Sequence, residues 1–160
     1  MIFDELTKVI KKEATNFNVE TFINKDELFE YLSNKFKMAG VIKNKEKFIK
    51  ALYERENQGS TYMGKLIAIP HGKSSTVNIP AIGFCKCNKP FEYVSHEEKG
   101  LVKFVFMFAI TNETEKNSYL KILALLAGLL AKEVFIKELD LCENYEDLIN
   151  LISSYDKKKG

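Results

Sequence analysis

An unbroken apolar run, Phe104-Val105-Phe106-Met107-Phe108-Ala109-Ile110, places the tightest limit on the fold of this 160-residue chain. Side chains alternate between the two faces of a β-strand, so a strand with this sequence is apolar on both faces. Such a strand fits the middle of a sheet that helices cover on both sides. The run therefore predicts a central strand over Leu101–Ile110.

Helical and strand-like patterns alternate along the rest of the chain. We predict helices over Phe3–Glu13, from Asn24 to Gly40, from Asn44 to about Asn57–Gly59, over Lys116–Lys132 and over Tyr145–Ser154. Short strands are predicted over Phe17–Phe22, Leu66–Ile69 and Ala81–Cys85. Interleaved elements of this kind are typical of the α/β class. The prediction is a single domain over residues 1–160, with a mixed β-sheet sandwiched between layers of α-helices.

Composition narrows the choice of partners and compartment. The 24 basic and 22 acidic side chains give a formal charge of +2, whereas nucleic-acid binding usually shows as a strongly basic domain or stripe. We therefore expect no nucleic-acid partner. The three cysteines are too few, and odd in number, for a disulfide framework, so we expect reduced thiols and a cytoplasmic protein. The longest apolar run, Ile122–Ala131, is shorter than the ~20 residues of a membrane span and is predicted to be a core helix.

His71 is the first candidate for chemistry among the two histidines of the chain. It follows Pro70 at the end of an apolar strand, where α/β sheets place their ligands. Gly72 comes next and lets a ligand or another backbone approach closely. An imidazole is mostly neutral at cell pH and is a known covalent nucleophile. Two interpretations fit these residues alone: a phosphoryl acceptor, or a histidine that simply ends a strand.

The other histidine and the cysteines give weaker signals. His96 lies in the polar segment Tyr93–Glu98 and is predicted to be an exposed loop residue. Cys85-x-Cys87 puts two thiols on one face of a strand, but structural zinc sites use C-x2–4-C spacing and a second ligand pair. The sequence has no Walker-type loop and no dinucleotide-binding glycine motif. We therefore predict no metal site and no direct use of ATP or NAD.

Several spaced motifs resemble one family. Arg55-Glu56, Ser60-Thr61, Gly64 and the run Ile67-Ala68-Ile69-Pro70-His71-Gly72 are similar to the signature of enzyme IIA domains of the fructose/mannitol type, from the bacterial sugar phosphotransferase system. In that family an Arg-Glu pair ends a helix, a loop with Ser-Thr follows, and Ala-Ile-Pro-His-Gly carries the phosphorylated histidine. The resemblance extends over roughly residues 17–155.

The resemblance implies a phosphotransferase component, a cytoplasmic phosphoryl carrier. His71 would accept a phosphoryl group from the histidine phosphocarrier protein and pass it to a cysteine of an enzyme IIB domain. A sugar that enters through the membrane permease is the indirect recipient. No cofactor is expected beyond the covalent phosphohistidine intermediate. Which sugar is served, and the oligomeric state, do not follow from the sequence.

Supporting roles carry over to residues near His71. Arg55 matches the residue that binds phosphate oxygens, since its guanidinium is a planar fork that is always charged. The alternative is a solvated arginine at a helix C-terminus, where the helix dipole also favours it. Thr61 either donates its hydroxyl to the phosphate or to His71, or caps a turn.

Tyr119 marks a departure from the family pattern. The family usually has a second histidine just before a leucine near the start of the long helix, and this chain has Ser118-Tyr119-Leu120 there. A tyrosine donates one hydrogen bond but cannot become a cation. This change keeps a second function open: a regulatory enzyme IIA-like module whose phosphorylation state controls binding to a transcription factor, kinase or transporter.

Overall fold

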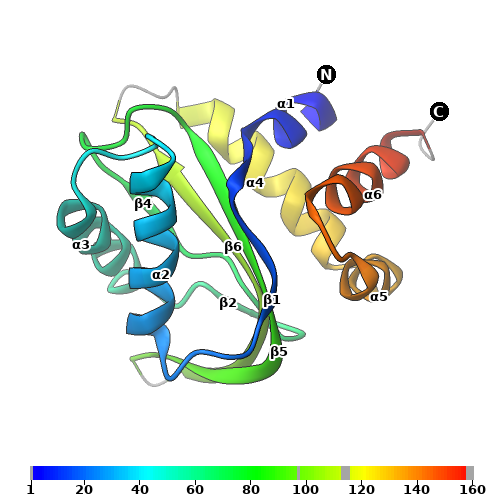
Figure 1. Cartoon of the computed structure of the whole chain (residues 1–160), viewed down its shortest axis with the longest axis horizontal. Helices are drawn as coiled ribbons and strands as arrows, with labels where there is room; N and C mark the ends of the chain where they lie inside the picture. Colours follow the sequence, from blue (N-terminus) through cyan, green and yellow to red (C-terminus); the bar gives the residue numbers. More distant parts are fainter. Residues whose placement is uncertain (1, 97, 113–115, 158–160) are drawn as a thin grey trace.

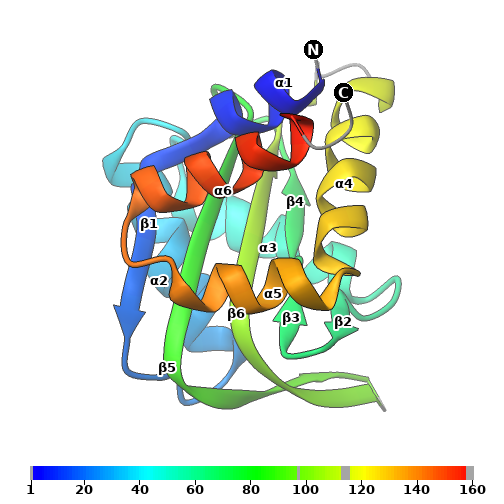
Figure 2. The same cartoon turned by 90° about the vertical axis from the view of Figure 1, so that its right-hand side faces the viewer.

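A computed structural model describes residues 2–96, 98–112 and 116–157, which form a six-stranded sheet with helices on both faces (Figure 1). Helices α2 and α3 cover one face, and α1, α4, α5 and α6 cover the other (Figure 2). The α/β class and the layered arrangement predicted from the sequence are therefore confirmed. In chain order the elements are α1 (Ile2–Val9), β1 (Ile10–Val19), α2 (Lys25–Met38), α3 (Lys45–Glu56), β2 (Tyr62–Gly64), β3 (Ile67–Ala68), β4 (His71–Lys73), β5 (Ala81–Ser95), β6 (Glu98–Ile110), α4 (Lys116–Leu130), α5 (Glu133–Leu141) and α6 (Tyr145–Lys157).

The apolar run of β6 lies between two hydrophobic cores, as its composition predicts. Val105, Met107 and Ala109 face the core under α2 and α3. Phe104, Phe106, Phe108 and Ile110 face the core under the other four helices. All of these side chains are buried, and β6 pairs with β5 on one side and with β3 and β4 on the other. The apolar burial on both faces therefore fixes β6 as the centre of the fold.

The sheet is mixed, with the strand order β1-β5-β6-β3-β2 and β4 paired to β6 beyond β3. β5 and β6 are antiparallel, whereas β3 and β4 both run parallel to β6. Pro70 separates β3 from β4 because it has no N–H for the ladder. Its carbonyl still accepts a hydrogen bond from the Phe108 amide at 2.9 Å, which keeps the chain beside β6. His71 therefore opens a second short strand, where the sequence predicted the end of one.

Helices α2 and α3 begin where the sequence predicts. The side chain of Asn24 accepts a hydrogen bond from the Glu27 amide at 3.0 Å, and Asn44 does the same for the Lys47 amide at 2.8 Å. Each asparagine thus satisfies one of the free N–H groups of a first helical turn. The α2 helix stops before Gly40, which has a φ of 78°. The α3 helix ends at Glu56, and this end positions the site described below.

Several elements differ from the prediction, among them the strand expected over Phe17–Phe22, which is the end of the longer β1 and stops at Val19. The chain leaves its helix at Val9, because Ile10 pairs with Ile82 in the parallel β1–β5 ladder and this pairing overrides the local helical pattern. Strand β5 runs on to Ser95, with an irregular register between Lys86 and Phe91. Helix α5 was not predicted, since Lys132 at its N-cap makes no side-chain capping hydrogen bond and gives no start signal.

The apolar run Ile122–Ala131 contributes to α4, and its buried side chains join the core on that face of the sheet. Figure 2 shows α4 lying along the sheet near β2, β3 and β4. Among the helices of the described residues, none combines the length and apolar character that a membrane span needs.

Candidate functional site

His71 lies on the edge of the sheet, where β4 runs beside β6 and α3 packs against it. The next residue explains how the helix comes so close. A Cβ atom on Gly72 would lie 3.1 Å from a ring carbon of Phe48 and 3.2 Å from the backbone nitrogen of Leu52, both in α3. Any side chain there would push the helix away. Gly72 therefore allows the close approach expected from the sequence, and the group that approaches is α3.

Both ring nitrogens of His71 have partners. Nδ1 lies 3.2 Å from the carbonyl oxygen of Ile69, and Nε2 accepts a hydrogen bond from the Arg55 Nε–H at 3.0 Å. A carbonyl only accepts and a guanidinium only donates. The two contacts therefore assign the proton to Nδ1 and leave the lone pair on Nε2.

The environment of His71 favours the neutral ring. Partial burial lowers the pKa of His71 below its ordinary value of 6.5, and the positive charge of Arg55 lowers it further. The Ile69 carbonyl and the Glu56 carboxylate act in the opposite direction but do not reverse the shift. At neutral pH the imidazole is thus uncharged, with an electron pair on Nε2 that accepts the hydrogen bond from Arg55.

Arg55 reaches His71 from the last turn of α3. Its Nη1 donates a hydrogen bond to the Gly59 carbonyl at 2.8 Å, while its Nε donates to His71. The guanidinium is therefore held at two points and is not a freely solvated side chain. Gly59 has a φ of 146°, a backbone conformation that favours glycine, and this turn brings its carbonyl under the guanidinium.

Two hollows border the His71 ring. One has a volume of about 330 Å³ and is lined by Ala51, Glu54, Arg55, Gln58, His71, Lys73, Ile110 and Tyr119. The other has a volume of about 230 Å³ and is lined by Arg55, Ser60, Thr61, Tyr62, Met63, Ile69, His71, Leu123 and Ala127. The structure thus brings Tyr119 into the same hollow as His71 and Arg55, although the three come from α4, β4 and α3.

Thr61 points its hydroxyl away from His71. Its Oγ1 donates to the Glu56 carboxylate and lies 2.7 Å from the Tyr93 hydroxyl. The Thr61 hydroxyl is buried in this contact, while its backbone carbonyl accepts from the Ile69 amide at 2.9 Å. In this arrangement the hydroxyl neither faces open solvent nor bonds to the imidazole.

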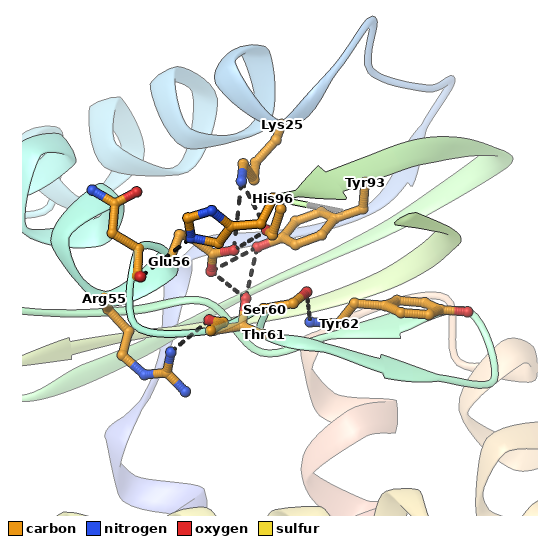
Figure 3. A network of polar contacts seen from close by, with 11 residues as sticks. Lys25, Arg55, Glu56, Ser60, Thr61, Tyr62, Tyr93 and His96 are labelled. Atoms are coloured by element: carbon orange, nitrogen blue, oxygen red, sulfur yellow. Dashed lines mark hydrogen bonds and ion pairs between the residues drawn. The ribbon is translucent and has the colours of Figure 1, made fainter. Parts of the chain in front are cut away.

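A buried polar cluster behind the site was not predicted from the sequence. It consists of Lys25, Glu56, Thr61, Tyr93 and Ser95, which we call the Glu56 cluster (Figure 3). Lys25 comes from the start of α2, Glu56 from the end of α3, and Tyr93 and Ser95 from β5. Figure 3 shows Arg55 pointing away from this cluster, although it is the neighbour of Glu56 in the chain.

The cluster occupies part of the segment expected to be a polar loop. Tyr93 and Ser95 alternate with exposed residues at the end of β5, a period-2 pattern that continues from buried Phe91. That alternation is the sequence signal that could have predicted a strand with Tyr93 and Ser95 buried. Burial raises the pKa of Tyr93 well above its ordinary value, so its hydroxyl keeps its proton and donates to Glu56. His96 itself is exposed, as predicted, with Nε2 3.2 Å from the Asn57 carbonyl oxygen.

The cysteines lie away from the site chemistry. Cys85 and Cys87 are buried in β5, and burial raises the pKa of Cys87 to about 12 and that of Cys85 well above its ordinary value. Both thiols therefore stay protonated and unreactive. Within residues 2–96, 98–112 and 116–157, no His, Cys, Asp or Glu side chains form a group of three or more with the spacing to hold a metal ion.

Comparison with known proteins gives a family match over most of the chain. The family model for the phosphoenolpyruvate-dependent sugar phosphotransferase system, EIIA 2, matches residues 8–155. The chain is 31% identical over 153 residues to the fructose-specific EIIABC component of Bacillus subtilis (strain 168), covering 96% of this chain and 24% of that protein. It is 31% identical over 147 residues to the mannitol-specific phosphotransferase enzyme IIA component of the same organism, covering 91% and 97%. The chain thus spans about a quarter of the first relative and nearly all of the second.

Solved structures share the fold. The nitrogen regulatory protein IIA-Ntr from Neisseria meningitidis superposes with a TM-score of 0.80 at 21% identity, covering 92% of this chain and 99% of that one. A chain from the complex of enzyme IIA and phosphorylated enzyme IIB for mannitol from Escherichia coli gives a TM-score of 0.72 at 19% identity, covering 91% and 97%. At these identities the likeness concerns the fold alone.

Proposed function

The chain belongs to the EIIA 2 family of the phosphoenolpyruvate-dependent sugar phosphotransferase system, and we propose that it carries phosphoryl groups on Nε2 of His71. One observation carries the choice of atom: Nδ1 faces the Ile69 carbonyl while Nε2 holds the lone pair. An attacking nitrogen needs that lone pair, and a neutral ring supplies it without prior loss of a proton.

The transfer is a displacement at phosphorus. The Nε2 electron pair forms the new P–N bond, the bond from phosphorus to the donor's nitrogen breaks, and its electron pair returns to the donor. The Arg55 Nε–H points at the same lone pair, so this hydrogen bond has to open before phosphorus arrives. The guanidinium then turns its N–H groups to the phosphoryl oxygens and offsets their charge. The Gly59 carbonyl keeps Arg55 within reach during this movement.

The hollow around His71 gives the phosphoryl group its surroundings. Lys73 lines it with a second positive charge, and its side chain lies on the same face of β4 as that of His71, because strand residues two apart share a face. Tyr119 lines it from α4, in the place of the family's second histidine. We assign to the Tyr119 hydroxyl a hydrogen bond to a phosphoryl oxygen. Glu54 lines the same hollow, and its negative charge repels the phosphoryl group. The positive charges of Arg55 and Lys73 offset this repulsion.

Family membership supports the choice of donor and acceptor. The donor in this proposal is the histidine phosphocarrier protein, and the acceptor is a cysteine of an enzyme IIB domain. The enzyme IIB partner has support from the fold shared with the enzyme IIA chain of the mannitol complex and from the EIIABC relative. A membrane permease then passes the group to a sugar. The cytoplasmic location, and the absence of any cofactor beyond the phosphohistidine, are part of this proposal.

A second candidate is a regulatory module that does not feed a permease. Tyr119, which stands where the family usually has a histidine, favours it. In this role the phosphohistidine is long-lived and changes the affinity for a partner protein. Onward transfer separates the two candidates, because only a carrier hands its phosphoryl group quickly to an enzyme IIB cysteine.

The proposal is tested with phosphoenolpyruvate, enzyme I and the histidine phosphocarrier protein. We expect an acid-labile, base-stable phosphate on the wild type, none on His71→Ala, and full labelling of the matched variant His96→Ala. Adding purified enzyme IIB should then discharge the label. Label that persists in His71→Ala would remove His71 as the acceptor, and a label that enzyme IIB never discharges would favour the regulatory candidate.

A further inference from the structure

We propose that Glu56 is a positioning residue for phosphoryl transfer: its carboxylate acts on Nδ1 of the His71 ring through a chain of hydrogen bonds, and its backbone carbonyl is linked to Nε2 through a second chain. Glu56 lines neither of the hollows that border His71. Besides the direct effect of its charge on the pKa of His71, Glu56 is linked to the ring through Thr61 and Ile69 on the Nδ1 side, and through Gly59 and Arg55 on the Nε2 side. The inference rests on the proposed role of His71.

The Glu56 carboxylate is a fixed point because it is buried and fully bonded. Only 2% of Glu56 is exposed. Its Oε1 accepts from the Ser95 hydroxyl at 2.5 Å and pairs with the Lys25 ammonium at 3.5 Å, and its Oε2 accepts from Thr61 and from Tyr93 at 3.1 Å. A buried carboxylate is tolerated only with such partners. Movement of the carboxylate would break several of these contacts at once, so α2, α3 and β5 hold it in one place.

The first chain of contacts leads to Nδ1. The Thr61 hydroxyl is held by Glu56, and the Thr61 carbonyl accepts from the Ile69 amide at 2.9 Å. The Ile69 carbonyl in turn faces Nδ1 of His71 at 3.2 Å. This contact keeps the proton on Nδ1. The Thr61 side chain thus takes part in the site without touching the phosphoryl group.

The second chain leads to Nε2 through the end of α3. The Glu56 carbonyl accepts from the Gly59 amide at 3.1 Å. The Gly59 carbonyl accepts from Arg55 Nη1 at 2.8 Å, and Arg55 Nε donates to Nε2 at 3.0 Å. This chain begins at the backbone carbonyl of residue 56, so a change of the Glu56 side chain should act on the Nδ1 side of the ring.

Thr61→Val tests the inference with the smallest change in shape, since it removes the hydroxyl bonded to Glu56. Thr61→Ser keeps the hydroxyl and should restore function. Thr76→Val is the matched control: Thr76 is also buried, and its hydroxyl accepts from the Asn44 amide at the other end of α3. All three variants are compared with the wild type by circular dichroism before use.

The first readout is the ¹⁵N spectrum of the His71 ring near neutral pH, which reports the tautomer and needs no partner protein. We expect the wild type, Thr61→Ser and Thr76→Val to hold the proton on Nδ1, and Thr61→Val to show a mixture of tautomers. The second readout is transfer from the phosphocarrier protein. We expect kcat to fall roughly tenfold in Thr61→Val with KM unchanged, as for the loss of a hydrogen bond to a charged group.

Equal spectra and equal kcat in Thr61→Val and Thr76→Val would overturn the inference. If Thr61→Val does not fold, Tyr93→Phe removes another donor to the Glu56 carboxylate and gives the same comparison. A wild type that is never phosphorylated would defeat the proposed function, while the ring spectrum would still decide whether Glu56 positions His71.

Discussion

Arg55 and Glu56 are neighbours at the end of α3, yet their side chains lie in opposite environments. Successive residues of a helix point about 100° apart, and here that rotation separates a hollow from the protein interior. Arg55 borders both hollows beside His71, with two hydrogen bonds. Glu56 is buried among Lys25, Ser95 and the rest of its cluster (Figure 3).

This difference in environment matches a difference in role, because Arg55 has to move during transfer and Glu56 has to stay in place. Arg55 must release Nε2 when phosphorus arrives, and its two neutral acceptors allow this at moderate cost. Glu56 has to remain charged in a buried place, where an unpaired carboxylate costs several kcal/mol, about 3–5 when a partner is removed. Stability should therefore depend more on Glu56 than on Arg55, while Arg55 acts directly on the transferred group.

We expect the largest effect, on the free energy of unfolding, when the Glu56 cluster is disrupted. Glu56→Ala leaves the Lys25 ammonium, whose side chain is only 12% exposed, without its counter-ion, and we expect a loss of about 3–5 kcal/mol in the free energy of unfolding. Urea denaturation measures it. Glu54→Ala, on the exposed side of the same helix turn, is the control and should stay within about 0.5 kcal/mol of the wild type. Equal losses in the two variants would mean that the cluster contributes no special stability.

Arg55→Lys should slow transfer and leave the stability nearly unchanged, in contrast to Glu56→Ala. A point charge cannot replace the guanidinium fork, so transfer should lose roughly 1–3 kcal/mol of transition-state stabilisation. The free energy of unfolding should stay nearly constant, because Arg55 is only half-buried. Rapid-mixing kinetics in both transfer directions, next to urea denaturation, measure the two quantities. Unchanged rates would return Arg55 to the role of a helix-terminal cation.

The pH profile should show which protonation state of His71 accepts the phosphoryl group. Burial and Arg55 lower the pKa of His71 below 6.5, so the neutral ring prevails at every pH above that value. Acceptance should be nearly constant from about pH 7 to 8 and should fall by about tenfold per pH unit below the lowered pKa. Stopped-flow rates, corrected with a donor-only control, test this. A rate that rises as the solution becomes acidic would contradict a neutral acceptor.

Tyr119 should give the smallest effect. If its hydroxyl donates to a phosphoryl oxygen, Tyr119→Phe should shorten the lifetime of the phosphohistidine by the equivalent of about 0.5–1.5 kcal/mol. Tyr119→His should shift the kinetics toward those of family members with two histidines. The lifetime of the isolated phosphoprotein is the measurement, since it involves no partner. An identical lifetime in Tyr119→Phe would leave Tyr119 as a wall of the hollow only.

The sequence predicted the exposed chemistry of the site better than its buried support. Gly72 follows His71 directly, and Arg55 lies 16 residues before His71 in a motif order typical of the family; the structure places the three together. Lys25 and Ser95 are distant from Glu56 in the sequence, and only the packing of α2 and β5 against α3 joins them. No local sequence pattern predicts contacts between residues so far apart in the chain.

The wrongly predicted helices and strands have the same cause, dependence on residues that are distant in the sequence. Asn24 and Asn44 carry local capping signals, and their helices begin as predicted. Ile10 enters a strand because of its partner in β5, and α5 begins without a capping side chain at Lys132. Features that depend on neighbours in the chain were thus predictable, whereas those that depend on distant partners were not.

The most direct test of the account is the position of phosphorus on the imidazole. Nuclear magnetic resonance of the ¹⁵N-labelled phosphoprotein, prepared with phosphoenolpyruvate, enzyme I and the phosphocarrier protein, detects the coupling between phosphorus and a ring nitrogen. We expect coupling to Nε2 of His71, with Nδ1 still carrying its proton. Phosphorus on Nδ1, or on His96, would contradict it.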